Sequence, residues 1–109
     1  MRWTVETLDH RVDAELDALP ADMRSRFVHI SALLEHFGPQ AVREPYVKPL
    51  GNKLWEMRMK GRDGISRAVY VATVGQRLVV LHVFIKKTAK TPRAALETAM
   101  RRGKEANLL

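Results

Sequence analysis

Residues 54–85 read LWEMRMKGRDGISRAVYVATVGQRLVVLHVFI, and this stretch decides the fold. Its apolar and β-branched residues form three runs, 54–59, 65–74 and 78–85, which are separated by the glycine-containing turns 61–64 and 75–76. Runs of this length and composition predict three strands joined by tight turns into an antiparallel meander. The third run is nearly all apolar, so we expect it to be the most central strand.

Alternation along residues 54–59 assigns the side chains to two faces. Trp55, Met57 and Met59 fall on one face, and Glu56 and Arg58 fall on the other. This pattern predicts a half-buried strand. Arg58 lies between two methionines and is therefore expected to project from the body of the sheet.

The run 78–85 changes character as it leaves the core. Its strict alternation places Val80, His82, Phe84 and Lys86 on one face and Leu81, Val83 and Ile85 on the other. Along the first of these faces, the side chains change from aliphatic to imidazole, aromatic and ammonium groups. It continues into KKTAKT over residues 86–91, where three lysines within five positions indicate a site for anions.

The remaining chain predicts one short strand and three helices. Residues 3–8 alternate as a strand, Asp9 caps a helix carrying Val12, Leu16 and Leu19, and a second helix follows Pro20. The apolar stripe of the second helix is Met23, Phe27, Ile30, Leu34 and Phe37, and Gly38-Pro39 ends it. Residues 43–52 read as an extended connection, and Thr91 as cap with Pro92 at the first position begins a final helix.

These elements define an α+β fold in a single domain spanning residues 1–109. We expect a small, mostly antiparallel sheet with an N-terminal helical hairpin on one face and a C-terminal helix. The apolar fraction of 46% and the charged fraction of 28% exclude a wholly disordered chain. No run approaches the length of a membrane span and no secretory leader is visible, so we expect a cytoplasmic protein.

Charge indicates the class of partner. The net charge is +7, yet residues 1–44 carry −3 and residues 45–109 carry +10. The second half is therefore expected to face a polyanion, such as nucleic acid, the ribosome, an anionic membrane or an acidic protein. The chain has no cysteine, which excludes disulfide scaffolds, thiolate metal sites and thiol nucleophiles.

Guanidinium groups, aromatic planes and lysines in one region suit single-stranded RNA and its cleavage through the 2′-hydroxyl. The catalytic candidates are Arg58, Arg67, His82, Lys86 and Lys87. The RNA-binding candidates are Tyr70, Phe84, Lys90, Lys53 and Lys60. No metal or other cofactor is expected, because the histidines and carboxylates show no ligand spacing.

Each candidate also has a structural interpretation. Arg58 and Arg67 could pair with Glu56 or Asp63. The other four alternatives are a half-buried structural role for His82, core roles for Phe84 and Tyr70, and a solvated loop over residues 86–90.

Several of these residues also occur in a known pattern. The pattern consists of Pro49-Leu50, LWEMR over residues 54–58, Arg67 three residues before Tyr70, LHVFIKKT over 81–88 and KTP over 90–92. With these residues the chain resembles the HigB/RelE superfamily of bacterial toxins. The resemblance is closer to its phage-derived, Gp49-like branch. It extends over essentially the whole chain, because the order of expected elements also agrees.

The resemblance implies a type II toxin that enters the ribosomal A site and cuts mRNA without a metal ion. It implies neutralisation by a cognate helix-turn-helix antitoxin of the HigA/Xre type, in a hetero-oligomer. By the same resemblance, Arg58 and Arg67 hold the scissile phosphate, and Lys86 and Lys87 supply catalytic or RNA-binding charge.

Two departures from the family pattern leave the general base open. Glu56 stands where relatives often carry a lysine, and the last helix has no tyrosine or histidine. His82 or a lysine could take that role. Two other functions remain open, a ParE-like toxin that inhibits DNA gyrase by binding it and a non-catalytic RNA- or ribosome-binding domain.

Overall fold

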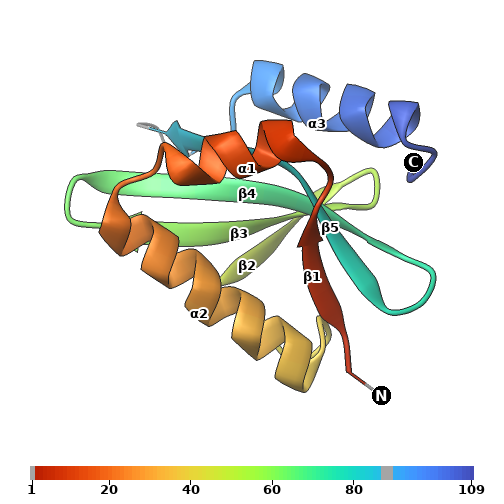
Figure 1. The fold of residues 1–109 in the computed structure, drawn as a ribbon, viewed down its shortest axis with the longest axis horizontal. Helices are drawn as coiled ribbons and strands as arrows, with labels where there is room; N and C mark the ends of the chain where they lie inside the picture. The colour runs from red at the N-terminus through yellow and green to blue at the C-terminus, as the bar shows by residue number, and fades with distance from the viewer. Residues whose placement is uncertain (1, 87–89) are drawn as a thin grey trace.

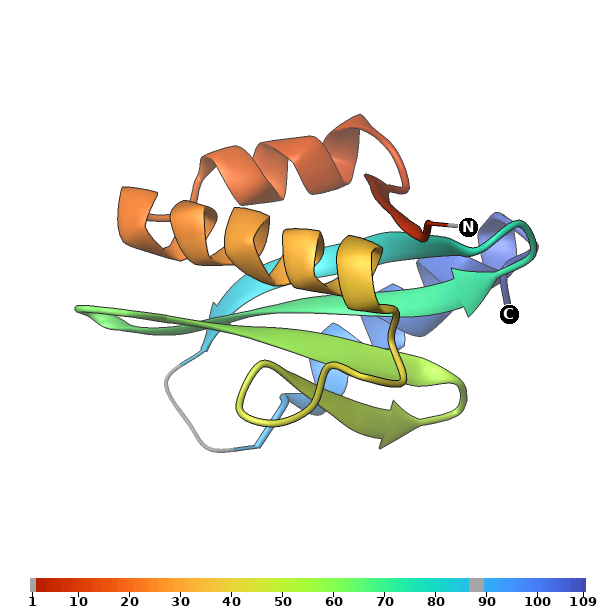
Figure 2. The ribbon, with the colours of Figure 1, turned by 90° about the horizontal axis from the view of Figure 1, so that it is seen from below.

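The computed structural model describes residues 2–86 and 90–109 as one five-stranded sheet with helices on both faces (Figures 1 and 2). The elements are β1 (Thr4–Thr7), α1 (His10–Asp17), α2 (Ala21–Phe37), β2 (Val47–Gly51), β3 (Leu54–Gly61), β4 (Gly64–Thr73), β5 (Arg77–Lys86) and α3 (Arg93–Glu105). The strands lie in the order β1-β5-β4-β3-β2. β1 is parallel to β5, and the other neighbours are antiparallel.

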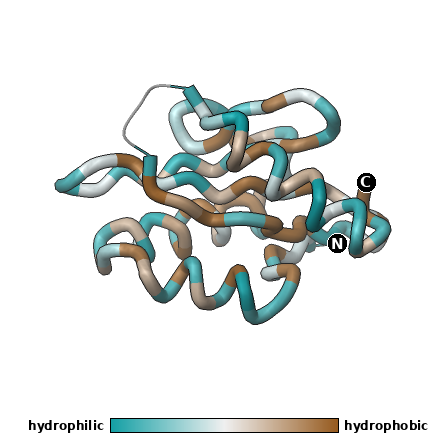
Figure 3. Tube along the Cα trace, turned by 90° about the horizontal axis from the view of Figure 1, so that it is seen from above, coloured by the Kyte–Doolittle hydropathy of each residue, from teal (hydrophilic) through white to brown (hydrophobic). Residues whose placement is uncertain are grey.

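Each face of the sheet has its own apolar core. α1 and α2 cover one face as a hairpin, and α3 lies on the opposite face (Figure 2). The first core includes Met23 and Leu34 of α2 packed with Met57 of β3, and the second includes Ala99 of α3 packed with Val69. Figure 3 shows long apolar stretches along the strands, whereas the helices alternate between apolar and polar residues. The predicted α+β class, with a helical hairpin on one face, is confirmed, and the structure adds that the C-terminal helix covers the other face.

The sheet differs from the expectation in two respects. Residues 47–51, which were expected to lie within an extended connection, form the edge strand β2, and Pro49 lies within it. Proline has no N–H to donate and is therefore tolerated on an edge strand, which explains why the sequence pattern concealed it. β4, not β5, is the middle of the five strands, because the short β1 adds to the far side of β5.

A β-bulge in β5 changes the predicted faces. Val69 pairs with His82, but the next residue of β4, Tyr70, pairs with Val80, so Leu81 is an extra residue. Val80 consequently packs with the hairpin core, and Leu81 packs with the α3 core. The strict alternation expected across Val80 and His82 is wrong because one inserted residue reverses the faces on either side of it.

The helices follow the predicted stripes with one exception. Met23, Ile30 and Leu34 of α2 are buried, whereas Phe37, the last residue of the helix, is 60% exposed. A repeat of 3.5 residues drifts around a helix of 3.6 residues per turn, which carries Phe37 to the margin of the stripe. Within the described residues, no helix combines the length and apolarity needed to cross a lipid bilayer.

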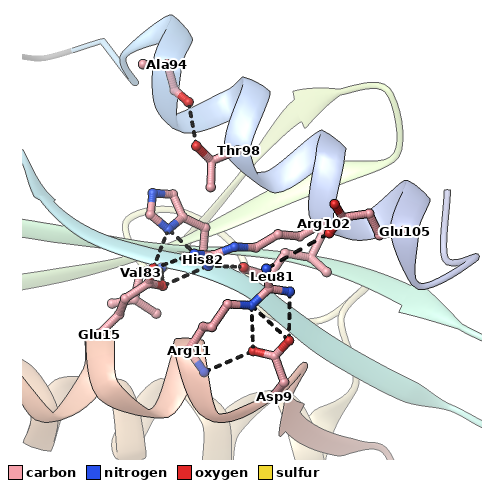
Figure 4. Close-up of polar contacts among 10 residues, drawn as sticks. All are labelled: Asp9, Arg11, Glu15, Leu81, His82, Val83, Ala94, Thr98, Arg102 and Glu105. Atoms are coloured by element: carbon pink, nitrogen blue, oxygen red, sulfur yellow. Dashed lines mark hydrogen bonds and ion pairs between the residues drawn. The ribbon is translucent and has the colours of Figure 1, made fainter.

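Glu15 of α1 joins three elements at the free edge of β5. β1 ends opposite Val80, so no strand of residues 2–86 and 90–109 pairs with the edge of β5 beyond that point. The Glu15 carboxylate accepts hydrogen bonds from the Val83 N–H at 2.9 Å and from Nη1 of Arg102 of α3 at 3.2 Å, and its Oε2 lies 3.1 Å from Nδ1 of His82 (Figure 4). Arg102 also donates to the Leu81 carbonyl at 2.9 Å. This junction replaces the missing strand and holds α1 and α3 on the sheet.

The charge state of Glu15 links this junction to pH. Burial acts to raise the pKa of the carboxyl, but the hydrogen bonds from Arg102 and Val83 and the nearby His82 outweigh it, so the pKa lies below its ordinary value of 4.5. Because the pKa of Glu15 is lower in the folded than in the unfolded state, its ionised carboxylate stabilises the fold at pH values above the unfolded-state pKa. This stabilisation is lost as the pH falls through the folded-state pKa.

Replacing Glu15 by Gln is therefore expected to destabilise the protein at neutral pH but not in acid. The free energy of unfolding should fall by about 2 kcal/mol at pH 7, because charge-assisted hydrogen bonds are weakened. The difference from the wild type should shrink as the pH falls well below 4.5, the ordinary pKa of the group. Urea unfolding followed by circular dichroism across this pH range measures both effects.

Glu105→Gln is the matched control, because its exposed carboxylate makes only a 4.0 Å contact with Arg11. It should change the free energy of unfolding by less than about 0.5 kcal/mol. Equal losses in the two variants, or a Glu15→Gln loss that persists in acid, would contradict the assigned role of the junction.

Candidate functional site

Three rows of side chains cross β3, β4 and β5 on the face that also carries α3. Strand register places Glu56, Val69 and His82 in the first row, Arg58, Arg67 and Phe84 in the second, and Lys60, Ile65 and Lys86 in the third. Residues two apart on a strand share a face, so the rows lie about 7 Å from one another. α3 packs on the part of the face around Val69, Val71 and Leu81, toward the first row. Phe84 of the second row also packs against this core, whereas no residue of the third row is part of it.

Glu56 is the buried hub of these rows. The sequence placed it on the solvated side of a half-buried strand, but its side chain is fully buried. Its carboxylate accepts a hydrogen bond from the Arg67 guanidinium and another from the Thr91 hydroxyl at 2.6 Å. Nε of Arg58 lies 4.0 Å from the same carboxylate. A buried carboxylate is stable only with such partners, so Glu56 orders all three side chains.

The two arginines consequently differ. Arg67 is 1% exposed, and its guanidinium pairs with Glu56, one of the structural partners that the sequence left open. The side chain of Arg58 is 28% exposed and only at the margin of ion-pair distance from Glu56. Arg58 is therefore the guanidinium in the second row that a bound phosphate could reach.

Thr91 was expected to cap the last helix, but it does not. The residue before α3 is Pro92, no side chain caps the helix, and the Thr91 hydroxyl donates to Glu56 instead. The hydroxyl thereby ties the segment that leads into α3 to the centre of the sheet face.

Lys86 has a buried ammonium group at the end of β5. The residue is 5% exposed, and Nζ has no hydrogen-bond partner among the described residues. Burial lowers the pKa of this amine, and Arg67, Arg58 and Lys48 lower it further, against the opposing effect of Glu56. A lysine with a lowered pKa has a larger neutral fraction at a given pH, which suits proton transfer.

His82 and Phe84 stand side by side on β5. Their rings stack with centroids 5.1 Å apart and an interplanar angle of 28°. Nδ1 of His82 faces Glu15, which fixes the orientation of the ring (Figure 4). Phe84 packs partly against the α3 core, so it combines the core role and the surface position that the sequence left as alternatives.

The structure separates Tyr70 from this site. Tyr70 is buried in the core beneath the helical hairpin, on the opposite face of the sheet from Arg58, and burial raises the pKa of its hydroxyl. A base cannot stack on it there, and its predicted packing alternative agrees with this position. The bulge near Tyr70 does not bring it to the other face, because Ala68 and Tyr70 both pack with the hairpin core.

The predicted lysines occupy different places. Lys60 is exposed at the end of β3 in the third row, and Lys53 is exposed in the turn between β2 and β3. Lys90 is exposed just before α3. Lys87 lies outside the described residues.

Lys48 is a cation of this face that the sequence analysis missed. It pairs in register with Glu56 across β2 and β3, so it extends the first row by one strand. The missed signal was a proline in a short apolar run beside a turn, which is compatible with an edge strand. Across residues 2–86 and 90–109, histidine and acidic side chains form no group of three or more that could hold a metal ion.

We expect a strongly non-additive response when Glu56 and Arg67 are replaced. Glu56→Leu and Arg67→Met should each lower the free energy of unfolding by about 3–5 kcal/mol, because each leaves an uncompensated buried charge. The double variant should lose less than either single variant, since it removes both charges. Thr91→Val, which removes one hydrogen bond, should cost about 1–2 kcal/mol. Urea unfolding of the four variants measures the coupling, and additive losses would contradict a shared buried pair.

Comparisons with known proteins place this geometry in a family. A chain in the crystal structure of the archaeal RelE–RelB complex from Pyrococcus horikoshii OT3 is similar in fold, with a TM-score of 0.59 and 22% sequence identity. The alignment covers 82% of this chain and 100% of that chain. A comparison with curated proteins found no match.

The profile of the family described as phage-derived protein Gp49-like matches residues 14–104. This span contains all nine positions of the three rows and most of both helical layers. The chain therefore belongs to the phage-derived Gp49-like family and has the fold of RelE, as the sequence resemblance predicted.

Proposed function

We propose that this protein is the toxin of a type II toxin–antitoxin system and that it cleaves mRNA on the ribosome without a metal ion. One observation carries the proposal. A partly exposed guanidinium, that of Arg58, and a buried amine of lowered pKa, that of Lys86, occur in adjacent rows of a cationic sheet face. Membership of the Gp49-like family and the RelE-like fold support the toxin assignment.

The reaction is an internal transfer of the phosphoryl group. The ribose 2′-oxygen attacks the adjacent phosphorus while its proton passes to a base, and a pentavalent phosphorane forms. The bond from phosphorus to the 5′-oxygen of the next nucleotide then breaks, and that oxygen takes up a proton. The products are a 2′,3′-cyclic phosphate and a free 5′-hydroxyl. The protein must therefore supply a proton acceptor, a proton donor and positive charge for the phosphorane.

In this proposal Arg58 stabilises the phosphorane and Lys86 accepts the 2′-hydroxyl proton, which requires the bound RNA to displace the side chains that cover the Lys86 amine. The guanidinium of Arg58 offers two parallel N–H groups to two phosphate oxygens. Arg67 acts as a positioning residue, because its guanidinium is held by Glu56 and stands between Arg58 and Phe84 in the second row. Its charge also favours the neutral form of Lys86.

His82 supplies the proton to the leaving 5′-oxygen, and Phe84 provides the plane on which an unstacked base lies. Glu15 holds the imidazole in place, and the ring of Phe84 continues the surface beside it. Contacts with the RNA backbone are assigned to four lysines, Lys53, Lys60, Lys87 and Lys90. The ammonium group of a lysine suits electrostatic contacts with phosphates.

The ribosome, mRNA and a helix-turn-helix antitoxin are the partners in this proposal, which places the protein in the cytoplasm. The structure of RelE with RelB supports an antitoxin partner, because the similar chain there is part of a complex. The net charge of +10 over residues 45–109 supports a ribosomal target, since ribosomal RNA is a polyanion.

Arg58→Ala is expected to abolish growth arrest while leaving the fold intact. Loss of one phosphorane-stabilising donor should lower the cleavage rate by about 10²–10³-fold. The side chain is partly exposed, so the melting temperature should change little. Primer extension on cellular mRNAs after brief induction measures cleavage, and Arg62→Ala, an exposed cation at the β3–β4 turn, is the matched control.

The same induction experiment separates the alternative toxin class. In-frame cuts in translated regions that vanish with Arg58→Ala support the nuclease. Intact mRNA together with inhibited gyrase supercoiling would replace it with a gyrase-binding toxin. Growth arrest that survives Arg58→Ala would also contradict the nuclease.

The Lys86 assignment predicts a pH dependence with a definite sign. A general base must be deprotonated, so the single-turnover cleavage rate on programmed ribosomes should rise from neutral to mildly alkaline pH. The lowered pKa of Lys86 brings this rise below the ordinary lysine value of 10.5. Lys86→Arg keeps the charge but cannot lose its proton, so the rise should vanish and the rate should fall about 10²-fold or more.

His82→Asn provides the comparison for this pH profile. It should slow cleavage while retaining the alkaline rise, because the acceptor remains. If His82→Asn removes the rise and Lys86→Arg retains it, the acceptor is His82 and the assignment to Lys86 is wrong.

A further inference from the structure

A groove lies between the edge strand β2 and the beginning of α3, beside the three rows. β2 contributes Lys48, Pro49 and Leu50 to its lining, and the segment into α3 contributes Lys90, Arg93 and Leu96. These two segments are some forty residues apart in the sequence, and Thr91 holds them together because its hydroxyl bonds to Glu56 of the neighbouring strand β3.

The groove is continuous with the candidate site. Lys48 pairs in register with Glu56, which in turn bonds to Arg67 and lies near Arg58. Lys48 is also one of the cations that, after burial and Arg67, lower the pKa of Lys86. An RNA strand with a phosphate at Arg58 would therefore reach this groove with an adjacent nucleotide.

The walls of the groove are cationic. Lys48, Lys90 and Arg93 line it, and no carboxylate is among its described lining residues. Nε of Arg93 donates to Glu97 at 3.1 Å, but both side chains are well exposed, so water and a stronger anion compete with this pair.

The floor of the groove is apolar. Pro49, Leu50 and Leu96 provide it, and Leu50 and Leu96 also pack against the core beneath α3. This arrangement matches a nucleotide, which has an anionic phosphate on one side and a flat, largely apolar base on the other.

We propose that this groove binds one nucleotide of single-stranded RNA next to the scissile phosphate, with its phosphate at Lys48 and Arg93 and its base against Leu50 and Leu96. The inference deepens the proposed function and rests on it, since it gives the path of the substrate beyond Arg58. An acidic peptide would satisfy the cations but would leave the apolar floor without a matching group.

Binding of a non-cleavable RNA tests the groove directly. The probe is a short 2′-O-methyl oligoribonucleotide, which lacks the attacking hydroxyl, titrated into methyl-labelled protein and followed by NMR. The methyl resonances of Leu50 and Leu96 should shift on binding. Lys48→Ala and Arg93→Ala should each weaken the affinity by about five- to tenfold. Each should also reduce the slope of log affinity against log salt by about 0.7.

Arg26→Ala is the control, because it removes one exposed cation from α2, on the other face of the sheet. It should leave both the affinity and the salt slope near the wild-type values. A polyglutamate peptide of the same net charge as the RNA is the second probe. It should bind more weakly and should leave the Leu50 and Leu96 resonances unshifted.

The outcomes separate the groove from the nuclease. If Lys48→Ala and Arg93→Ala bind the RNA as the wild type does, or if polyglutamate binds equally well, the nucleotide groove is wrong even when mRNA cleavage is confirmed. If the RNA shifts Leu50 and Leu96 as expected but Arg58→Ala leaves growth arrest intact, the groove binds RNA but not beside a scissile phosphate, and the nuclease is wrong.

Discussion

The burial of one carboxylate, that of Glu56, organises the functional face of this protein. A buried anion in a chain of net charge +7 is stable only when cations and hydroxyls surround it. Glu56 meets this requirement with Arg67 and Thr91 and with Arg58 at the margin of ion-pair distance. It therefore ties β3, β4 and the segment before α3 together. The positive charge that Glu56 leaves uncompensated is the charge available to a substrate.

A second polar junction completes the framework at the other side of β5. β1 is only four residues long, so β5 continues beyond it with an open edge. Glu15 and Arg102 bond to the strand-edge N–H and C=O groups of Val83 and Leu81, and each belongs to a helix. The groups that satisfy the open edge thus also dock α1 and α3. His82 gains its orientation from this junction, which links the packing of the helices to the geometry of the site.

As a result of the two junctions, the cations of the second and third rows differ in their burial and in their polar partners. Arg67 is neutralised by Glu56, Arg58 is partly hydrated, and Lys86 is buried without a hydrogen-bond partner in the described part of the chain. Charges of one sign held this close repel one another, and an incoming phosphate relieves the repulsion. Affinity for an anion and a lowered lysine pKa therefore arise from the same arrangement.

The α+β class, the meander of β3, β4 and β5, the helical hairpin on one face and the concentration of positive charge in the second half could all be predicted from the amino-acid sequence. These follow from local periodicity, turn residues and composition, which neighbours in the chain suffice to define. The folded chain was needed to show that Glu56 and Arg67 are buried together, that Leu81 is a bulge, that Tyr70 faces the hairpin and that Lys48 joins the site. Burial and pairing depend on contacts between distant segments, and a single inserted residue reverses the faces of a strand.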